Sequence, residues 1–149
     1  MRLNAIEAEL KQLEVEPDLL LSVLSTLSSV PCLSSLTINT FNILKYSTDI
    51  YRIVFNLPLL KYFKFSTNNS DLFISLPSRT DEQNSSIKYL VIDHHCTLNE
   101  IVLLTSYTPQ LDHLYVHKVE KNLQNFSGIN LYHLNSIYLY IYNITFNEG

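Results

Sequence analysis

Apolar residues recur along this chain in a short fixed pattern, with Leu, Ile, Val or Phe at the first, fourth and sixth positions of a segment. Successive segments begin 23, 27, 27, 24 and 23 residues apart, a nearly constant period. Because side chains alternate along a strand, positions four and six should face one side of a sheet, and positions three, five and seven the other. The six segments begin at Leu10, Leu33, Leu60, Ile87, Leu111 and Leu134.

This period indicates a leucine-rich repeat, in which each unit supplies one strand and a returning helix or loop. A single unit cannot bury its apolar face alone, so neighbouring units stack and share a core. Pro31, Pro58 and Pro109 each stand two residues before a first position, where proline ends a helix and starts an extended segment. We therefore expect an α/β fold: one leucine-rich repeat solenoid domain over residues 1–149, with about five to six repeats, a curved parallel sheet, and helices and loops on the convex side.

Helices are expected at 17–29, from Ser47 onward, and at 98–107, where apolar residues follow helical spacing. Residues 1–16 fit either a helix or a first strand, and we favour the strand. The first and last strands then lie close to the two ends of the sequence, which suggests a fragment of a longer protein. The strands are expected near 11–15, 34–39, 61–66, 88–93, 112–117 and 136–142.

The outward positions of the last four expected strands are rich in tyrosine and histidine. Tyrosine offers a large contact area and one polar tip at low entropic cost, and it is enriched in binding hot spots. An alternative is that these rings only stabilise the sheet through cross-strand pairs. The predicted protein-binding residues on the concave face are Tyr62, Lys64, Tyr89, Asp93, His113, Tyr115, His117, Tyr138 and Tyr140.

Composition narrows the classes of partner. A net charge of −4 with ten Lys and Arg gives no basic surface for nucleic acid. No apolar run is long enough for a membrane span, and the N-terminal stretch has acidic residues where a secretion signal needs an apolar core. Two cysteines, Cys32 and Cys96, form no disulfide framework. We expect an intracellular protein, cytoplasmic or nuclear, without a nucleic-acid or membrane partner.

One run of residues, Asp93-His94-His95-Cys96, carries the ligand types of a zinc site. We favour simple burial of Cys96 at the strand-to-helix turn, because the adjacent histidines should diverge, and we expect no metal site. Asp93 and His117 would hold equivalent positions on neighbouring strands and could form an ion pair. The chain has no Gly-x-Ser-x-Gly motif, and two glycines do not make a phosphate-binding loop. We expect no catalytic residue, no cofactor and no enzymatic activity.

The run YLVIDHHCTLNE (89–100), with SYTPQLDHLYV (106–116) and the segments PCLSSLTI and PLLKYFKF, resembles the leucine-rich part of divergent F-box proteins. In that family an N-terminal F-box docks the adaptor of a cullin ubiquitin ligase, and the repeats hold the substrate. No Leu-Pro-x-Glu-type F-box precedes Leu10, so the adaptor would be a partner only if an F-box lies upstream. The resemblance implies substrate recognition; the alternative is a structural or assembly fragment that pairs through uncapped ends.

Overall fold

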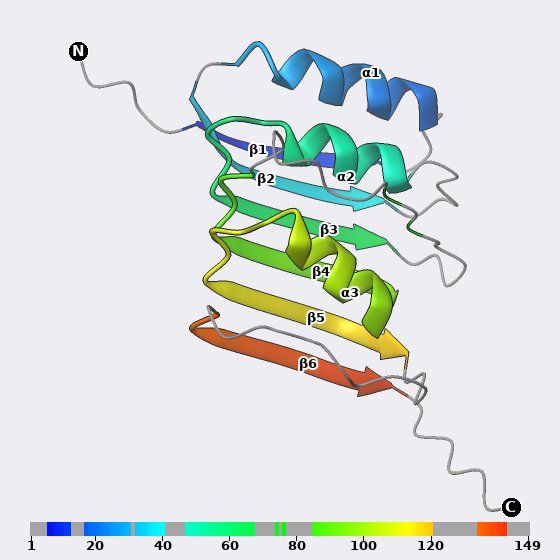
Figure 1. Ribbon diagram of the computed structural model, residues 1–149. Helices are drawn as coiled ribbons and strands as arrows, with labels where there is room; N and C mark the ends of the chain where they lie inside the picture. The colour runs from blue at the N-terminus through cyan, green and yellow to red at the C-terminus, as the bar shows by residue number, and fades with distance from the viewer. Residues whose placement is uncertain are drawn as a thin grey trace, which may run out of the picture.

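A computed structural model describes residues 6–12, 17–30, 32–40, 47–67, 74, 76, 85–120 and 134–142 of the chain. Within these, six strands form one parallel sheet and follow one another in chain order (Figure 1). The three described helices lie on one side of that sheet, which confirms the predicted α/β class. The elements are β1 (Ile6–Gln12), α1 (Pro17–Leu27), β2 (Leu33–Thr40), α2 (Ser47–Phe55), β3 (Tyr62–Thr67), β4 (Tyr89–Thr97), α3 (Leu98–Ser106), β5 (His113–Glu120) and β6 (Ser136–Tyr142).

The core lies between the sheet and the helices. Leu24, Val54 and Leu104, one from each helix, are fully buried and belong to the same apolar cluster as the inward side chains of the strands. The fourth and sixth positions of β2 to β5 are at most 1% exposed, so these side chains are the centre of the core. They are Leu36, Ile38, Phe63, Phe65, Leu90, Ile92, Leu114 and Val116.

The strand register follows the sequence pattern. Leu36 pairs with Phe63, Phe63 with Leu90, and Leu90 with Leu114, so the fourth position of each segment lies beside its equivalent on the next strand. The strands predicted from β2 to β6 are confirmed, β6 with both ends as expected and the others within four residues at each end. The first, fourth and sixth positions therefore predicted both the strand locations and their alignment.

The strand predicted near 11–15 is wrong. β1 spans Ile6–Gln12, and its register places Ala8 beside Leu36 and Leu10 beside Ile38. Leu10 thus holds the sixth position of its segment and not the first. The cause is visible in the letters IEAEL, where apolar and acidic residues alternate with the two-residue period of a strand. Residues 13–15 lie outside the described part of the chain.

β4 and β5 contain irregularities that the sequence pattern did not predict. From Ile92 to Cys96, β4 advances four residues, while the paired stretch of β5, from Val116 to Val119, advances three. β4 therefore carries one extra residue, which is a β-bulge. Its strand continues to Thr97, four residues beyond the predicted end. The side chains of β4 keep their alternation through this stretch, with Ile92, His94 and Cys96 all inward, whereas on β5 the inward Val116 and Val119 are three residues apart.

A capping box fixes the start of α3 directly after β4. The Thr97 hydroxyl accepts the backbone N–H of Glu100 at 3.2 Å, and Glu100 Oε2 accepts the backbone N–H of Thr97 at 2.7 Å. Glu100 Oε1 also accepts the N–H of Ile74 at 3.2 Å. The buried carboxylate therefore satisfies two backbone donors from separate segments, which is how an acidic side chain can lie inside the core.

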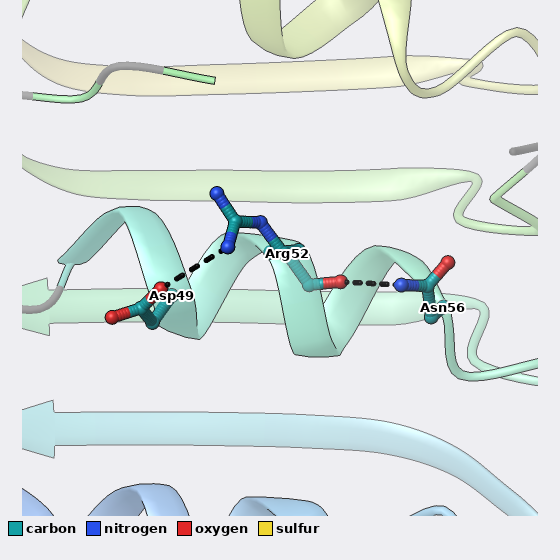
Figure 2. Close-up of polar contacts among 3 residues, drawn as sticks. All are labelled: Asp49, Arg52 and Asn56. Atoms are coloured by element: carbon teal, nitrogen blue, oxygen red, sulfur yellow. Dashed lines mark hydrogen bonds and ion pairs between the residues drawn. The ribbon is translucent and has the colours of Figure 1, made fainter. Parts of the chain in front are cut away.

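The outer surface of α2 is polar. Arg52 Nη1 lies 3.5 Å from Asp49 Oδ1, and Asn56 Nδ2 donates to the Arg52 carbonyl oxygen at 3.0 Å (Figure 2). An ion pair this exposed contributes little to stability, so these residues mark a solvated surface. None of the helices in the described ranges is long and apolar enough to cross a membrane.

Candidate functional site

The side of the sheet opposite the helices carries the residues that the sequence analysis selected. We call the third, fifth and seventh positions of β3 to β6 the outward face. The strand register aligns the third and fifth positions in rows across the sheet, because neighbouring strands are parallel and in phase up to the sixth position. The first row is Tyr62, Tyr89, His113 and Ser136, and the second is Lys64, Val91, Tyr115 and Tyr138.

In the first row, two rings stack. The centroids of Tyr89 and His113 lie 4.3 Å apart with an interplanar angle of 12°. His113 Nδ1 also bonds to the Ser136 hydroxyl, so its ring is fixed from both neighbouring strands. Tyr89 nevertheless remains 46% exposed, which leaves part of its surface available to another molecule.

In the second row, Tyr115 is the centre of an aromatic group. Its ring centroid lies 5.3 Å from that of His117 and 6.1 Å from that of Tyr138. His117 is in turn 6.3 Å from Tyr140. Tyr138 and Tyr140 are both 64% exposed, and Tyr115 is 39% exposed. The structure thus brings together four of the predicted binding residues from β5 and β6.

Asp93 links this aromatic group to β3. Its Oδ2 accepts the Ser66 hydroxyl at 2.8 Å, and its Oδ1 lies 3.8 Å from His117 Nδ1. The predicted approach of Asp93 and His117 is confirmed. Since the serine hydroxyl donates to the carboxylate and not to the imidazole, these three residues do not have the order of a nucleophile, base and acid.

The two selected residues of β3 lie at the margin of the aromatic group. Tyr62 pairs with Tyr89 in the strand register, and Lys64 pairs with Val91. Both side chains are half-buried. The valine separates Lys64 from Tyr115, so the lysine is a neighbour of the aromatic group and not part of it.

The candidate metal-binding run does not converge. In β4, His94 and Cys96 point into the core and are at most 1% exposed, whereas Asp93 and His95 are half-buried on the other side. The alternation of the strand therefore separates the run into two pairs. Among the described side chains, no group of three or more His, Cys, Asp or Glu residues could hold a metal ion.

Sequence reasoning missed a buried polar pair inside the core. Tyr51 of α2 and His94 of β4 are both fully buried, and Tyr51 Oη lies 2.6 Å from His94 Nε2. His94 Nδ1 lies 2.8 Å from the His95 carbonyl oxygen. A carbonyl oxygen only accepts, so Nδ1 carries the ring proton, and the Tyr51 hydroxyl donates to Nε2.

Burial changes the acid–base properties of this pair and of the cysteine beside it. Desolvation lowers the pKa of His94 and raises the pKa of Tyr51, because each ring is kept in its neutral form. Desolvation is also the main cause that raises the pKa of Cys96, and the Glu100 carboxylate adds to it. Cys96 is therefore a protonated core thiol, without the thiolate that nucleophilic chemistry needs.

The outward face offers broad ring surfaces, phenol hydroxyls, imidazoles and one carboxylate. That combination suits a surface that recognises another macromolecule through packing and hydrogen bonds. The buried side chains of Tyr51, His94 and Glu100 are hydrogen-bonded within the core and serve structure. In comparison with known proteins, no protein-family model, no curated protein and no solved structure matches the chain.

Proposed function

We propose that this chain is a leucine-rich repeat solenoid that binds a protein through the outward face, on the concave side of a curved sheet. The observation that carries the proposal is the exposed aromatic group on β4 to β6, where Tyr89, Tyr115, Tyr138 and Tyr140 are 39–64% exposed. Exposed apolar surface of this kind costs free energy in water, and its usual compensation is an interface. The proposed role is non-enzymatic.

Two features support the repeat architecture. The sheet is parallel and sequential, which is what stacked strand–helix units would give. Cys96 is buried at the end of β4, just before α3, and leucine-rich repeats use asparagine or cysteine near that place. The extra residue in β4 brings Cys96 opposite Val119, which is the ninth position of its own segment.

The resemblance to F-box proteins favours a ubiquitin-ligase substrate as the bound protein. The residues proposed to hold it are those of the outward face, and none is assigned to the ligase adaptor. The same resemblance supports an intracellular site of action.

The test is the double substitution Tyr89→Ala and Tyr115→Ala. Both rings lie on the outward face, and neither belongs to the core. We expect the variant to lose capture of the partner that co-purifies with the unmodified chain, while its far-UV circular dichroism stays unchanged. Unfolding of the variant would instead mean that the rings stabilise the sheet.

A matched control removes exposed apolar surface elsewhere. Leu19 on α1 and Leu59 before β3 are 54% and 49% exposed. The double variant Leu19→Ala and Leu59→Ala should capture the partner as well as the unmodified chain does. Equal loss in both double variants would refute a specific role for the outward face.

A second candidate function is structural: the chain would assemble with further repeats or with another copy. The specific observation in its favour is the exposure of Ile137 and Leu139 in β6, at 38% each. A sizing measurement separates the two, since a monodisperse monomer favours the binding module, whereas association that grows with concentration favours assembly.

A further inference from the structure

The inward side chains of β6 are partly exposed, whereas the equivalent side chains of β2 to β5 are buried. Ile137 and Leu139 pair with Leu114 and Val116 of β5, which are at most 1% exposed. The inward side chains of β5 are therefore covered, whereas each of the two equivalent side chains of β6 keeps more than a third of its surface exposed to solvent. Apolar surface in this position extends the core toward the edge of the sheet.

β6 is also the last strand of the sheet that the described residues form. Among the described strands, only β5 pairs with it, so one line of backbone N–H and carbonyl groups faces outward. Proteins protect such edges with lysine, proline, bulges or short strands. The seven residues of β6, SIYLYIY, contain no charge, proline or glycine. An edge of this composition favours pairing with another strand.

The sequence of the edge identifies the pairing strand. Residues 137–141 read Ile-Tyr-Leu-Tyr-Ile, the same in both directions. We propose that β6 pairs antiparallel with β6 of a second copy of this chain, about a twofold axis through Leu139. This rests on the structural candidate function, and it shares Tyr138 and Tyr140, but not Tyr89 and Tyr115, with the proposed protein-binding face.

The pairing matches like with like on both faces. On the outward face, Tyr138 lies opposite the partner subunit's Tyr140, and the reverse pair forms by symmetry. On the inward face, Leu139 lies opposite the partner subunit's Leu139. In the same antiparallel register, the backbone of residue 137 pairs with that of residue 141. Cross-strand aromatic and aliphatic pairs of this kind stabilise antiparallel sheets. The two sheets become one, and the open inward side of β6 continues into that of the second copy.

The experiment compares two charge patterns by sedimentation equilibrium over a range of concentrations. Tyr138→Lys with Tyr140→Lys places lysine opposite lysine twice, and we expect the dimer dissociation constant to rise about tenfold or more. Tyr138→Lys with Tyr140→Glu places lysine opposite glutamate twice and should restore dimerisation. A parallel pairing would instead oppose like charges in the second variant, which would then stay dissociated.

A control places the same charges away from the edge. Tyr89→Lys with Tyr115→Lys lies on β4 and β5 and should leave dimerisation unchanged even where it abolishes partner capture. The proposal is overturned if the unmodified chain is monomeric at every concentration, or if the two charge patterns at 138 and 140 behave alike. Failure of partner capture alone concerns the binding function and leaves the edge pairing intact.

Disulfide trapping tests the position of the axis without relying on affinity. Leu139→Cys places two thiols directly opposite each other, and mild oxidation should give a covalent dimer. Tyr140→Cys places them diagonally, about 7–8 Å apart, beyond the reach of a disulfide without backbone movement. Equal trapping at both positions would contradict an axis through Leu139. Circular dichroism of each variant verifies that the fold is retained.

Discussion

The hydrogen bond between Tyr51 and His94 is the most consequential polar contact inside the core. Both side chains are fully buried, and three phenylalanine rings pack around the pair. In a medium without water, a donor removed from one partner leaves the other unsatisfied. The pair is therefore worth more to stability than a contact of the same length on the surface. The packed rings are those of Phe55, Phe63 and Phe65.

Replacing Tyr51 by Phe should lower the free energy of unfolding by about 1–3 kcal/mol, because His94 Nε2 loses its donor while it stays buried. Urea denaturation measures the change. Tyr138→Phe removes a hydroxyl from a ring that is 64% exposed and should shift stability by less than about 0.5 kcal/mol. Equal effects of the two substitutions would mean that the buried hydroxyl contributes nothing specific.

The lowered pKa of His94 predicts that acid destabilises the fold. The unfolded chain binds a proton near the ordinary histidine pKa of about 6.5, whereas the folded chain binds it only at lower pH. The stabilising contribution is complete above about pH 6.5 and is lost as the pH falls toward the pKa of buried His94. Between the two pKa values the slope reaches at most about 1.4 kcal/mol per pH unit.

Urea denaturation at pH 7.5, 6.5 and 5.5 measures this slope. The variant His94→Gln has no titrating group at this position and should show a flatter dependence over the same interval. A variant slope as steep as that of the unmodified chain would assign the acid sensitivity to other groups.

The sequence could not predict this pair. On α2, Ile50, Ile53, Val54 and Leu57 gave a sufficient apolar face, and a tyrosine beside them looks like a residue at its margin. The structure buries Tyr51 completely and leaves Ile53 half-buried. Only the position of β4 across the core, with its histidine turned inward, determines which residue of the helix is buried. Which residue of α2 is buried is therefore decided by tertiary packing and not by the sequence of the helix.

At the scale of elements, the junction between β4 and α3 has the clearest local cause. Thr97→Ala removes the hydroxyl that accepts the Glu100 N–H at the start of α3, and it should lower the free energy of unfolding by about 1 kcal/mol. Thermal denaturation monitored at 222 nm measures it. Thr26→Ala on α1 is the matched control, because that hydroxyl is exposed and bonds only within its own helix. A loss as large in the control would contradict a capping effect.

Elements with a regular apolar period were the predictable part of the fold. β6 and the starts of α1, α2 and α3 lie where the pattern placed them, since each begins with a local signal in its own residues. β1 was misplaced because its residues satisfy two patterns at once. The bulge in β4 depends on how that strand fits β5, and no single segment encodes such a fit.

The outward face was predictable in membership but not in geometry. Alternation alone placed Tyr89 and Tyr115 on the side away from the core, and the structure leaves both partly exposed. The stacking of Tyr89 on His113 and the bond from Ser66 to Asp93 depend on the register and on side-chain torsions. A sequence pattern predicts which side of the sheet a residue faces, but it does not predict which neighbouring side chain the residue contacts.

At the scale of the whole molecule, stability should decrease from the middle of the sheet to its ends. β3 and β4 have a strand on each side and inward side chains that are at most 2% exposed, whereas β6 has one described neighbour and inward positions that are 38% exposed. We expect amide hydrogen exchange in β3 and β4 to be slower than in β6 by on the order of tenfold or more. Mass spectrometry of peptic fragments measures this, and uniform protection across all strands would contradict the gradient.

The position of His94 has a consequence for how the chain is made. Tyr51 leaves the ribosome 43 residues before its acceptor does, and until then the first three strands lack the imidazole that their aromatic cluster encloses. We expect a nascent chain to resist proteases only after β4 has emerged, which stalled chains of increasing length would reveal. A chain that ends before β4 would then form an open intermediate in which the Tyr51 hydroxyl is still hydrated.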